Sequence, residues 1–209
     1  MTLFPLRKEI TRGGISIFVG VSLWELLARA LLENELLIPP PSSVARTFWN
    51  LTVSGELNKH FAATATEFIY GFGTACIFGV VLGYLMGMYR WFDEILDPWM
   101  AALYSIPVIA LVPMIIIWFG IGIFSKIVVV FKITLVAIIL NTAAGIKNLD
   151  PVWLELAQSM RLSSWQTTYK IRLPGALPFI ITGMRLGVGR ALLAVVVAEL
   201  MASNAGLVY

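Results

Sequence analysis

Ionisable side chains lie inside long apolar stretches of this sequence, and they are the residues most able to bind a ligand or form ion pairs. They are Glu67, Lys132, Arg185, Arg190 and Glu199. A charge near the centre of a bilayer costs several kcal/mol, so such residues rarely face lipid and usually pair with each other or line a path for a solute. A pair between Lys132 and either Glu67 or Glu199 is expected. Structural pairing and contact with a solute both stay open as roles.

A second group of polar residues fills the segment 150–174, which separates two apolar runs. Asp150 followed by Pro151 is the pairing typical of an N-cap residue and a first helical position. The sequence therefore predicts a short helix over 151–160.

A second helix is expected directly afterwards. Ser163 followed by Gln166 fits a capping box, and the helix should run to residue 172. Pro174 should end or kink it, because proline lacks the backbone N–H and clashes with the preceding turn. The two helices would meet near Arg161.

The composition places these residues in a membrane protein. The chain of 209 residues is 59% hydrophobic and 13% charged, with a mean hydropathy of +0.87, whereas soluble domains are roughly 25% charged. The net charge of +3 and the pI of about 9.1 reflect basic residues in loops between spans, which report orientation and not nucleic-acid binding. The single cysteine, Cys76, cannot form an intrachain disulfide.

Apolar segments long enough to cross a bilayer core of roughly 30 Å predict an all-α, polytopic transmembrane helical bundle. Five are expected, over 14–32, 62–88, 98–122, 125–146 and 176–201. The first also resembles a secretory signal, but an uncleaved span is preferred because Glu25 and Arg29 can pair one turn apart. We expect residues 1–61 to hold this span and an external segment, and 62–209 to form the core.

Lysine and arginine residues in the loops favour a cytoplasmic N-terminus. The inner loops would hold Arg7, Lys8, Arg12, Arg90, Lys147, Arg161, Lys170 and Arg172, and the outer loops would hold Arg46, Lys59 and Lys126. The segment 150–174 is then cytoplasmic. An interfacial helix over 42–51, ending near Gly55, lies outside, and so does the C-terminus, which suggests that a sixth span is missing.

Small residues and prolines mark two further features of the spans. Gly79, Gly83 and Gly87 form one stripe that would let another helix approach closely, as would Gly183 and Gly187. Packing within the bundle and the lining of a moving gate are both compatible with these stripes. In the third span, Pro107 and Pro113 each remove a backbone hydrogen bond, which makes this span a candidate gating element on the translocation pathway.

The segment 150–174 is richer in large apolar side chains than a solvated loop needs, and such residues anchor protein interfaces. They are Val152, Leu154, Met160, Trp165 and Tyr169. An inert surface helix pair is the alternative. A DNA-binding helix pair is excluded, because the segment is tethered by spans and has no basic recognition face.

The same segment resembles the cytoplasmic EAA loop of permease subunits of ABC importers. The matching residues are Glu155-Leu156-Ala157, Ser159, Ser163 and the closing Leu173-Pro174. The runs SIPVIALVPMIIIWFGIGIFSKI, NTAAGIKNLDP and LPGALPFIITGMRLGVGRALLAVVVAEL are similar to the branch that handles nitrate, sulfonates and taurine, and to some importers of riboflavin or thiamine precursors. The likeness runs from about residue 39 to the end.

This resemblance implies a type I ABC importer permease in a bacterial plasma (inner) membrane. It implies a permease homodimer surrounded by lipid, a cytoplasmic ABC ATPase subunit that hydrolyses ATP, and an extracellular or periplasmic solute-binding protein. The residues implied in ATPase coupling are Glu155, Ala157, Arg161, Ser163, Leu173 and Pro174.

The chain departs from the family pattern at three points. Arg161 replaces a glycine in the turn between the two coupling helices, so that turn either avoids positive φ or is strained. The sixth span is not seen. Glu67 stands where many oxyanion-type relatives carry arginine, which counsels against assuming an anionic solute.

Other functions fit the sequence less well. The chain has no phosphate-binding loop of the Walker type, so we expect ATP hydrolysis only in a partner. A secondary transporter or channel that works without an ATPase predicts inverted repeats, which the sequence does not display. A membrane enzyme is disfavoured, because the one histidine, His60, is expected in an external loop. No catalytic residue, metal site or cofactor of its own is therefore expected.

Overall fold

The computed structural model describes residues 4–31, 38–202 and 206–207, and the elements it assigns there are helical. They are α1 (Phe4–Leu31), α2 (Pro41–Ser54), α3 (Glu56–Met88), α4 (Arg90–Ser105), α5 (Val108–Phe119), α6 (Ile123–Lys147), α7 (Pro151–Ser159), α8 (Ser164–Thr167), the π-helix η1 (Thr168–Arg172) and α9 (Leu173–Ala202). The prediction of an all-α chain is confirmed. The chain divides into two compact units, Met1–Asn58 and Lys59–Tyr209.

In the first unit, a carboxylate of α1 caps the N-terminus of α2. Glu25 accepts hydrogen bonds from the Ser42 backbone N–H at 3.0 Å and from the Ser42 hydroxyl at 2.7 Å. Arg29 Nε donates to Glu25 at 2.6 Å, which confirms the expected pair. The helix α2 ends where Gly55 adopts a φ of 76°, as the sequence predicts, because glycine enters the left-handed region without a Cβ penalty.

Helices long and apolar enough to cross a membrane occur at four places among the described residues. They are Arg12–Ala30, Glu56–Met88, Ile123–Lys147 and the continuous stretch Ser164–Met201. The bent pair of α4 and α5 makes a fifth if it counts as one span.

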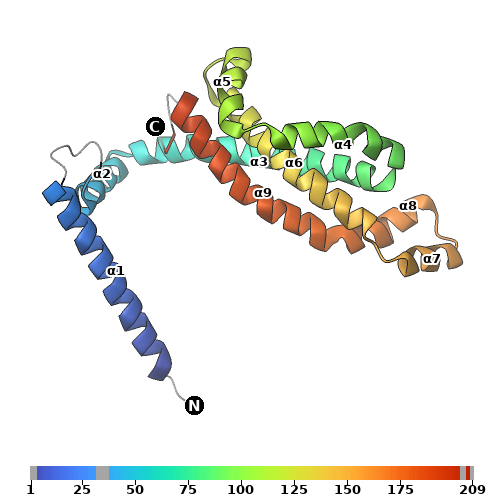
Figure 1. Cartoon of the computed structure of the whole chain (residues 1–209), viewed down its shortest axis with the longest axis horizontal. Coiled ribbons are helices and arrows are strands. Elements are labelled where there is room, and N and C mark those ends of the chain that lie inside the picture. The colour runs from blue at the N-terminus through green and yellow to red at the C-terminus, as the bar shows by residue number, and fades with distance from the viewer. Residues whose placement is uncertain (1–3, 32–37, 203–205, 208–209) are drawn as a thin grey trace. The chain divides into compact units, whose positions relative to one another are not determined.

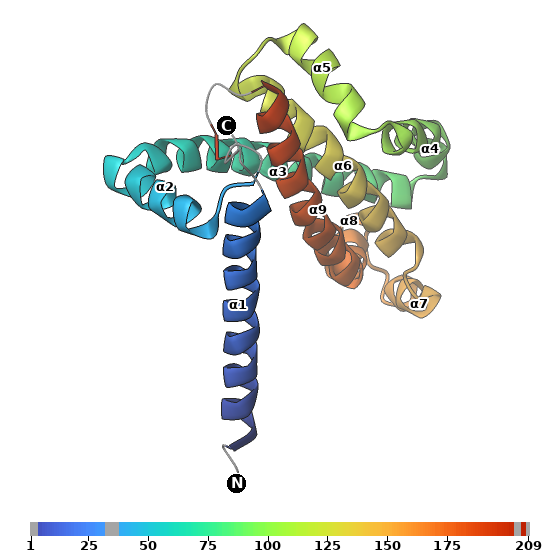
Figure 2. The ribbon, with the colours of Figure 1, turned by 60° about the vertical axis from the view of Figure 1, so that its left-hand side comes forward.

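The third predicted span, over 98–122, differs from a straight helix. The helix begins already at Arg90, stops at Ser105, and resumes as α5 after a bend of 104°. Figure 2 shows α5 turning away from α4 at this break. Pro107 explains it, because a residue before proline is pushed out of the helical region and Ile106 has an extended ψ of 120°. Pro113 stays inside α5.

A stripe of small residues joins α3 to α6. A Cβ atom added at Gly71, Gly79, Gly83 or Gly87 would come too close to Val130, Ile138, Thr142 or Ile146, respectively. Each glycine is separated from its partner by the same number of residues in the sequence, so the two helices run parallel. Contacts between them recur at multiples of four residues. The stripe packs within the bundle, which was one of its two expected roles.

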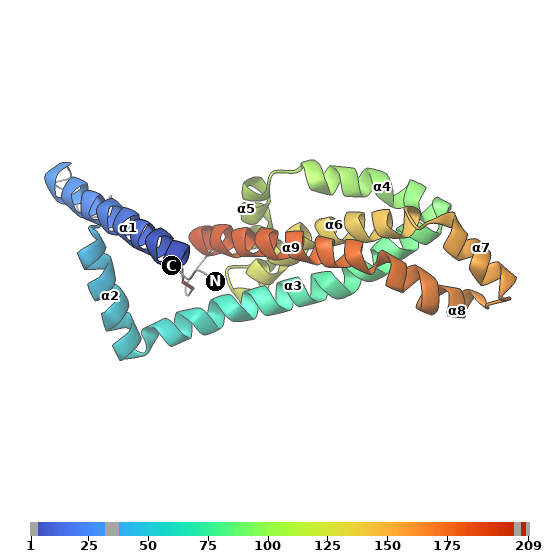
Figure 3. The same ribbon diagram turned by 90° about the horizontal axis from the view of Figure 1, so that it is seen from below.

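Helix α9 packs antiparallel on the same α6. Gly183 lies against Asn141, Gly187 lies against Thr134, and Gly145 of α6 lies against Phe179. Figure 3 shows α6 and α9 side by side, with α3 along them. Small residues therefore bring α3, α6 and α9 into close contact, and α4 and α5 join them through apolar clusters that include Met100 and Val112.

Candidate functional site

The first candidate site is the helix pair of residues 150–174, which lies at one end of the α6–α9 pair (Figure 1). The Asp150 side chain accepts a hydrogen bond from the Val152 backbone N–H at 3.0 Å, and Pro151 occupies the first helical position. Both observations confirm the predicted start of α7. The cap fixes the direction in which the chain leaves α6.

The turn between α7 and α8 keeps the geometry that normally uses glycine. The Arg161 N–H donates to the Gln158 carbonyl at 2.9 Å, and the Leu162 N–H donates to the Ala157 carbonyl at 2.9 Å. These are the two bonds of a Schellman motif. Arg161 has a φ of 50° and is the non-glycine residue with positive φ among those the structure describes. Of the two expected alternatives, the strained turn is the one present.

The second helix begins as predicted but does not end at the proline. Ser163 and Gln166 form a reciprocal capping box at the start of α8. The chain then continues through η1 into α9, so Ser164–Met201 is one helical stretch. Of the two outcomes expected at Pro174, an end or a kink, the helix end is not found. Pro174 lies in the first turn of α9, directly after a π-helical stretch. A π-turn is one of the local distortions that accommodate such a residue.

The exposed side of this helix pair is apolar and aromatic. Trp165 is 76% exposed and Tyr169 is 68% exposed. A separate groove of about 490 Å³ in the same segment is lined by Leu149, Trp153, Leu156, Met160, Leu162, Lys170, Ile171, Pro174 and Gly175. Glu155 is exposed and Ala157 is buried. Exposed aromatic side chains and an apolar groove are each typical of a protein interface.

Contacts that sequence reasoning missed tie this segment to α3. The hydroxyl groups of Tyr84 and Thr168 are 2.6 Å apart, and the Arg172 guanidinium contacts the Met88 sulfur. Thr168 and Arg172 are the first and last residues of η1. No local signal in the sequence links these positions, because the pairing depends on how α3 and α9 pack.

The charges inside the spans pair differently from the expectation. Glu67 binds Lys126, not Lys132, at 2.6 Å, with side chains 1% and 4% exposed. Lys126 was expected in an outer loop but belongs to α6. Glu67 lies four residues before Gly71, and Lys126 lies four residues before Val130, so the ion pair continues the spacing of the α3–α6 contacts. This shared spacing was the signal in the sequence that could have identified the pair.

The other buried carboxylate of the predicted set, Glu199, accepts a hydrogen bond from the Thr64 hydroxyl at 2.5 Å. The Thr64 oxygen also accepts from the Leu207 N–H at 3.1 Å. His60 lies in α3 and not in a loop, and its Nδ1 accepts from the Gly206 N–H at 3.2 Å. These bonds attach the C-terminal end of α9 to the N-terminal part of α3.

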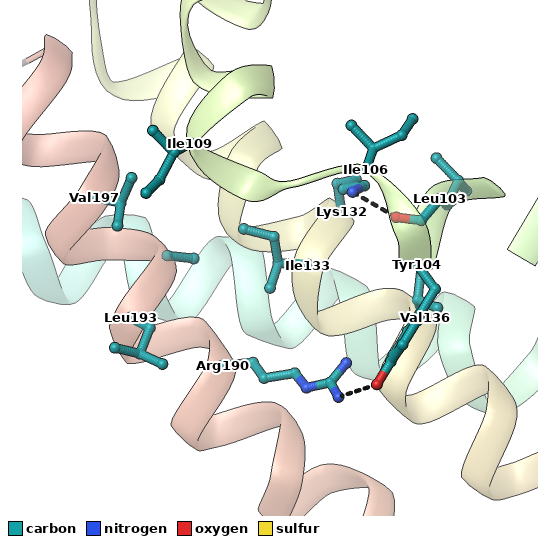
Figure 4. A pocket seen from close by; sticks show the side chains of 11 residues that line it. Leu103, Tyr104, Ile106, Ile109, Lys132, Ile133, Val136, Arg190, Leu193 and Val197 are labelled. Atoms are coloured by element: carbon teal, nitrogen blue, oxygen red, sulfur yellow. Dashed lines mark hydrogen bonds between the residues drawn. The ribbon is translucent and has the colours of Figure 1, made fainter. Parts of the chain in front are cut away.

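Lys132 and Arg190 come together in the second candidate site, a pocket of about 490 Å³ shown in Figure 4. Its walls come from α4, α5, α6 and α9 and the break between α4 and α5. The lining residues are Leu103, Tyr104, Ile106, Ile109, Lys132, Ile133, Val136, Arg190, Leu193, Ala194 and Val197. Lys132 Nζ donates to the Leu103 carbonyl at 2.7 Å, and Arg190 donates to the Tyr104 hydroxyl at 3.3 Å.

The remaining predicted pathway residues lie apart from this pocket. Arg185 is exposed on α9, and neither Pro107 nor Pro113 is among the lining residues. Pro107 nevertheless shapes the pocket, since its neighbours Ile106 and Ile109 line it. The predicted set thus separates into a cationic pocket, a buried ion pair and a helix break.

Together, the fold and these sites define a multi-pass α-helical membrane protein with a capped pair of short helices at one end of its bundle. Residues 78–209 match the family described as binding-protein-dependent transport system inner membrane component. The chain belongs to this family, so it is a permease of the inner membrane and not an enzyme.

Relatives agree with this assignment. The chain is 33% identical over 211 residues to the taurine transport system permease protein TauC of Escherichia coli (strain K12), covering 98% of this chain and 76% of that protein. It is 36% identical to the putative aliphatic sulfonates transport permease protein SsuC of the same organism, over 90% and 72% of the two chains. It is 37% identical to the riboflavin transport system permease protein RibX of Chloroflexus aurantiacus, over 82% and 64%. The resemblance to ABC importer permeases of the sulfonate and taurine branch is confirmed.

Proposed function

We propose that this chain forms the translocation pathway of an ATP-driven importer and that a cytoplasmic ATPase subunit grips it through residues 150–174. A solute-binding protein on the other side of the membrane delivers a small solute, and two permease copies enclose the path. The observation that carries this proposal is the helix pair itself. It is capped at both starts, apolar on its exposed side, and continuous with a membrane-spanning helix.

The continuity from α8 to α9 supplies the mechanical connection. A partner that moves the exposed end of the Ser164–Met201 stretch also moves its membrane-embedded part, because both belong to one continuous helical segment. Closure of the ATPase subunits on ATP would then shift the spans between inward-open and outward-open states. This mechanism requires the segment 150–174, and hence the N-terminus, to be cytoplasmic.

Each coupling residue has a role that fits its position. Glu155 is exposed and offers its carboxylate to a basic group on the ATPase, while Ala157 is buried and allows close packing. Arg161 and Ser163 set the angle between the two helices. Leu173 and Pro174 are the first two residues of α9 and join it to the preceding η1.

Among the solutes named for relatives, the sulfonate type fits this chain best. The doubt raised by Glu67 is reduced, because the charge of this carboxylate is balanced by Lys126 at 2.6 Å. The carboxylate therefore does not oppose an anion elsewhere in the pathway.

Substitution of Glu155 by lysine tests the coupling role. In proteoliposomes that contain the permease, its ATPase and its binding protein, we expect Glu155→Lys to lower ATP-dependent solute uptake at least about tenfold, since like charges would then face each other. Insertion into the membrane should be normal. The control is Glu56→Lys, which changes an exposed acid at the opposite end of α3 from the Tyr84 contact. Unchanged uptake in Glu155→Lys would remove the assignment of this segment to ATPase coupling.

The alternative is a secondary transporter or channel that needs no ATPase. It predicts solute flux in liposomes that contain the permease alone. The importer predicts flux only when the ATPase, the binding protein and ATP are all present. Flux through the isolated permease would therefore decide against the importer.

A further inference from the structure

Two cations of the pocket between α4, α5, α6 and α9 have no carboxylate partner among the residues that the structure describes. Ion pairs among the described residues join Glu25 to Arg29, Arg90 to Glu94, Lys126 to Glu67, and Lys147 to Asp93. Lys132 and Arg190 occur in none of them. Both lie in helices that are long and apolar enough to cross the membrane, where an uncompensated charge is costly and marks a functional position.

The groups that these cations do contact are neutral. Lys132 Nζ binds the Leu103 carbonyl, and Arg190 binds the Tyr104 hydroxyl, with its guanidinium carbon 5.2 Å from the centre of the Tyr104 ring. Ammonium and guanidinium groups have more N–H donors than these bonds use. The spare donors of Lys132 and Arg190 are therefore available to a ligand.

Figure 4 shows both side chains at the pocket, with α6 and α9 contributing one cation each. The lining residues include no acid, so the local charge is positive and uncompensated. An anion is the ligand that would balance it.

The rest of the lining limits what the anion can carry. Apart from Lys132, Arg190 and Tyr104, the pocket is lined by aliphatic side chains of isoleucine, leucine, valine and alanine. A volume of about 490 Å³ falls within the usual range for small-molecule sites. A ligand that suits both features has one compact oxyanion group and an aliphatic body.

We propose that this pocket binds an amphiphilic oxyanion of the alkanesulfonate type, with Arg190 and Lys132 at the oxyanion and the aliphatic wall around the tail. The assignment rests on the proposed importer function and adds to it the residues that hold the solute. Arginine presents a planar fork that matches two oxygens of such a group, and lysine adds a point charge. The break before Pro107 lies in the wall that holds Leu103 and Tyr104.

Binding to the complete transporter in lipid nanodiscs tests this assignment, with butane-1-sulfonate as the probe and isothermal titration as the measurement. The importer's binding protein is left out, so that only the membrane site is titrated. We expect Lys132→Met and Arg190→Gln each to weaken binding at least about tenfold, and Arg190→Lys to weaken it less. Butan-1-ol, which shares the tail but lacks the charge, should not compete.

Matched controls separate local from general effects of charge. Lys59→Met and Arg90→Gln remove exposed cations outside the pocket, and both should bind the probe as the unchanged protein does. Binding that is equally strong in the Lys132→Met/Arg190→Gln double variant would overturn the assignment.

The same measurement distinguishes a solute from a lipid headgroup. In nanodiscs of phosphatidylcholine alone, the probe should bind as well as in nanodiscs that contain phosphatidylglycerol. If phosphatidylglycerol displaces the probe and lowers the affinity more than tenfold, the pocket holds the headgroup of an anionic lipid and the solute assignment is wrong. Failure of the importer function would show separately, as absent ATP-dependent uptake in the unchanged transporter.

Discussion

Arg161 shows how one residue can retain a turn that usually requires glycine. Its φ of 50° costs a residue with a Cβ atom about 1–2 kcal/mol relative to the right-handed region. Two backbone hydrogen bonds of 2.9 Å, from Arg161 to Gln158 and from Leu162 to Ala157, hold the turn in place. The residue in the turn is unusual, but the geometry of the turn is the one that a glycine normally adopts.

Replacement of Arg161 by glycine should therefore stabilise the protein. We expect Arg161→Gly to raise the free energy of unfolding by up to about 1 kcal/mol, because glycine adopts positive φ without steric cost. Thermal unfolding of the purified permease in detergent measures the change. Arg161→Ala is the matched control, since it removes the guanidinium and keeps the Cβ. Equal stability of the Gly and Ala variants would show that the positive φ at position 161 does not strain the backbone.

Short sequence patterns were sufficient to predict features that depend only on residues close together in the chain. Asp150 with Pro151 and Ser163 with Gln166 predict the starts of α7 and α8, because caps involve neighbours in the chain. The Glu67–Lys126 pair was not predicted, because it depends on the register between two helices separated by a third span. The four-residue spacing of the small residues indicates the pair only once α3 and α6 are known to pack against each other, and one sequence does not state that packing.

At the scale of elements, the parallel packing of α3 and α6 depends on the absence of side chains. A Cβ atom at Gly83 would come within 2.6 Å of the Ile139 carbonyl oxygen, and backbone cannot move aside cheaply. In lipid, the hydrophobic effect does not drive helices together, so van der Waals contact between closely packed backbones supplies much of the energy of association. The Glu67–Lys126 pair then fixes the register at one end of this contact.

A single methyl group should disturb this contact. We expect Gly83→Ala to lower the free energy of unfolding by about 1–3 kcal/mol, because the helices must separate to make room. Gly73→Ala provides the control on the same helix, since a Cβ atom there meets nothing within 4 Å and alanine favours the helix by roughly 0.5–1 kcal/mol. Melting temperatures of the two variants should move in opposite directions. A similar fall in both would argue against a close-packed α3–α6 contact.

The third span illustrates where element-level prediction fails. Pro107 and Pro113 were identified from the sequence as possible breaks, but of the two only Pro107 breaks the helix. Pro113 lies within α5, and Pro98, the third proline of this span, lies within α4. Pro174 likewise lies within a continuous helix. Proline removes the same hydrogen bond at each site, so the local sequence does not decide the outcome. The packing around each proline does.

At the scale of the whole core, the exposed helix pair is attached to more than one span. It continues directly into α9, and the hydroxyl contact of 2.6 Å between Tyr84 and Thr168 connects it to α3. The contact falls in η1, and π-helical turns are frequent at functional sites. On the proposed importer function, α3 and α9 would move as one body when an ATPase displaces the helix pair.

Removal of either hydroxyl group should then loosen the coupling between ATP hydrolysis and transport. We expect Tyr84→Phe and Thr168→Val each to lower the solute transported per ATP in reconstituted transporter, since each removes one hydrogen bond worth about 1 kcal/mol and largely keeps the shape of the side chain. The double variant should be no worse than either single one, because both changes delete the same interaction. Tyr70→Phe, at an exposed tyrosine of α3, controls for loss of a tyrosine hydroxyl. Losses that add in the double variant, or a transport ratio that stays constant, would mean that α9 alone transmits the movement and that α3 follows it through packing.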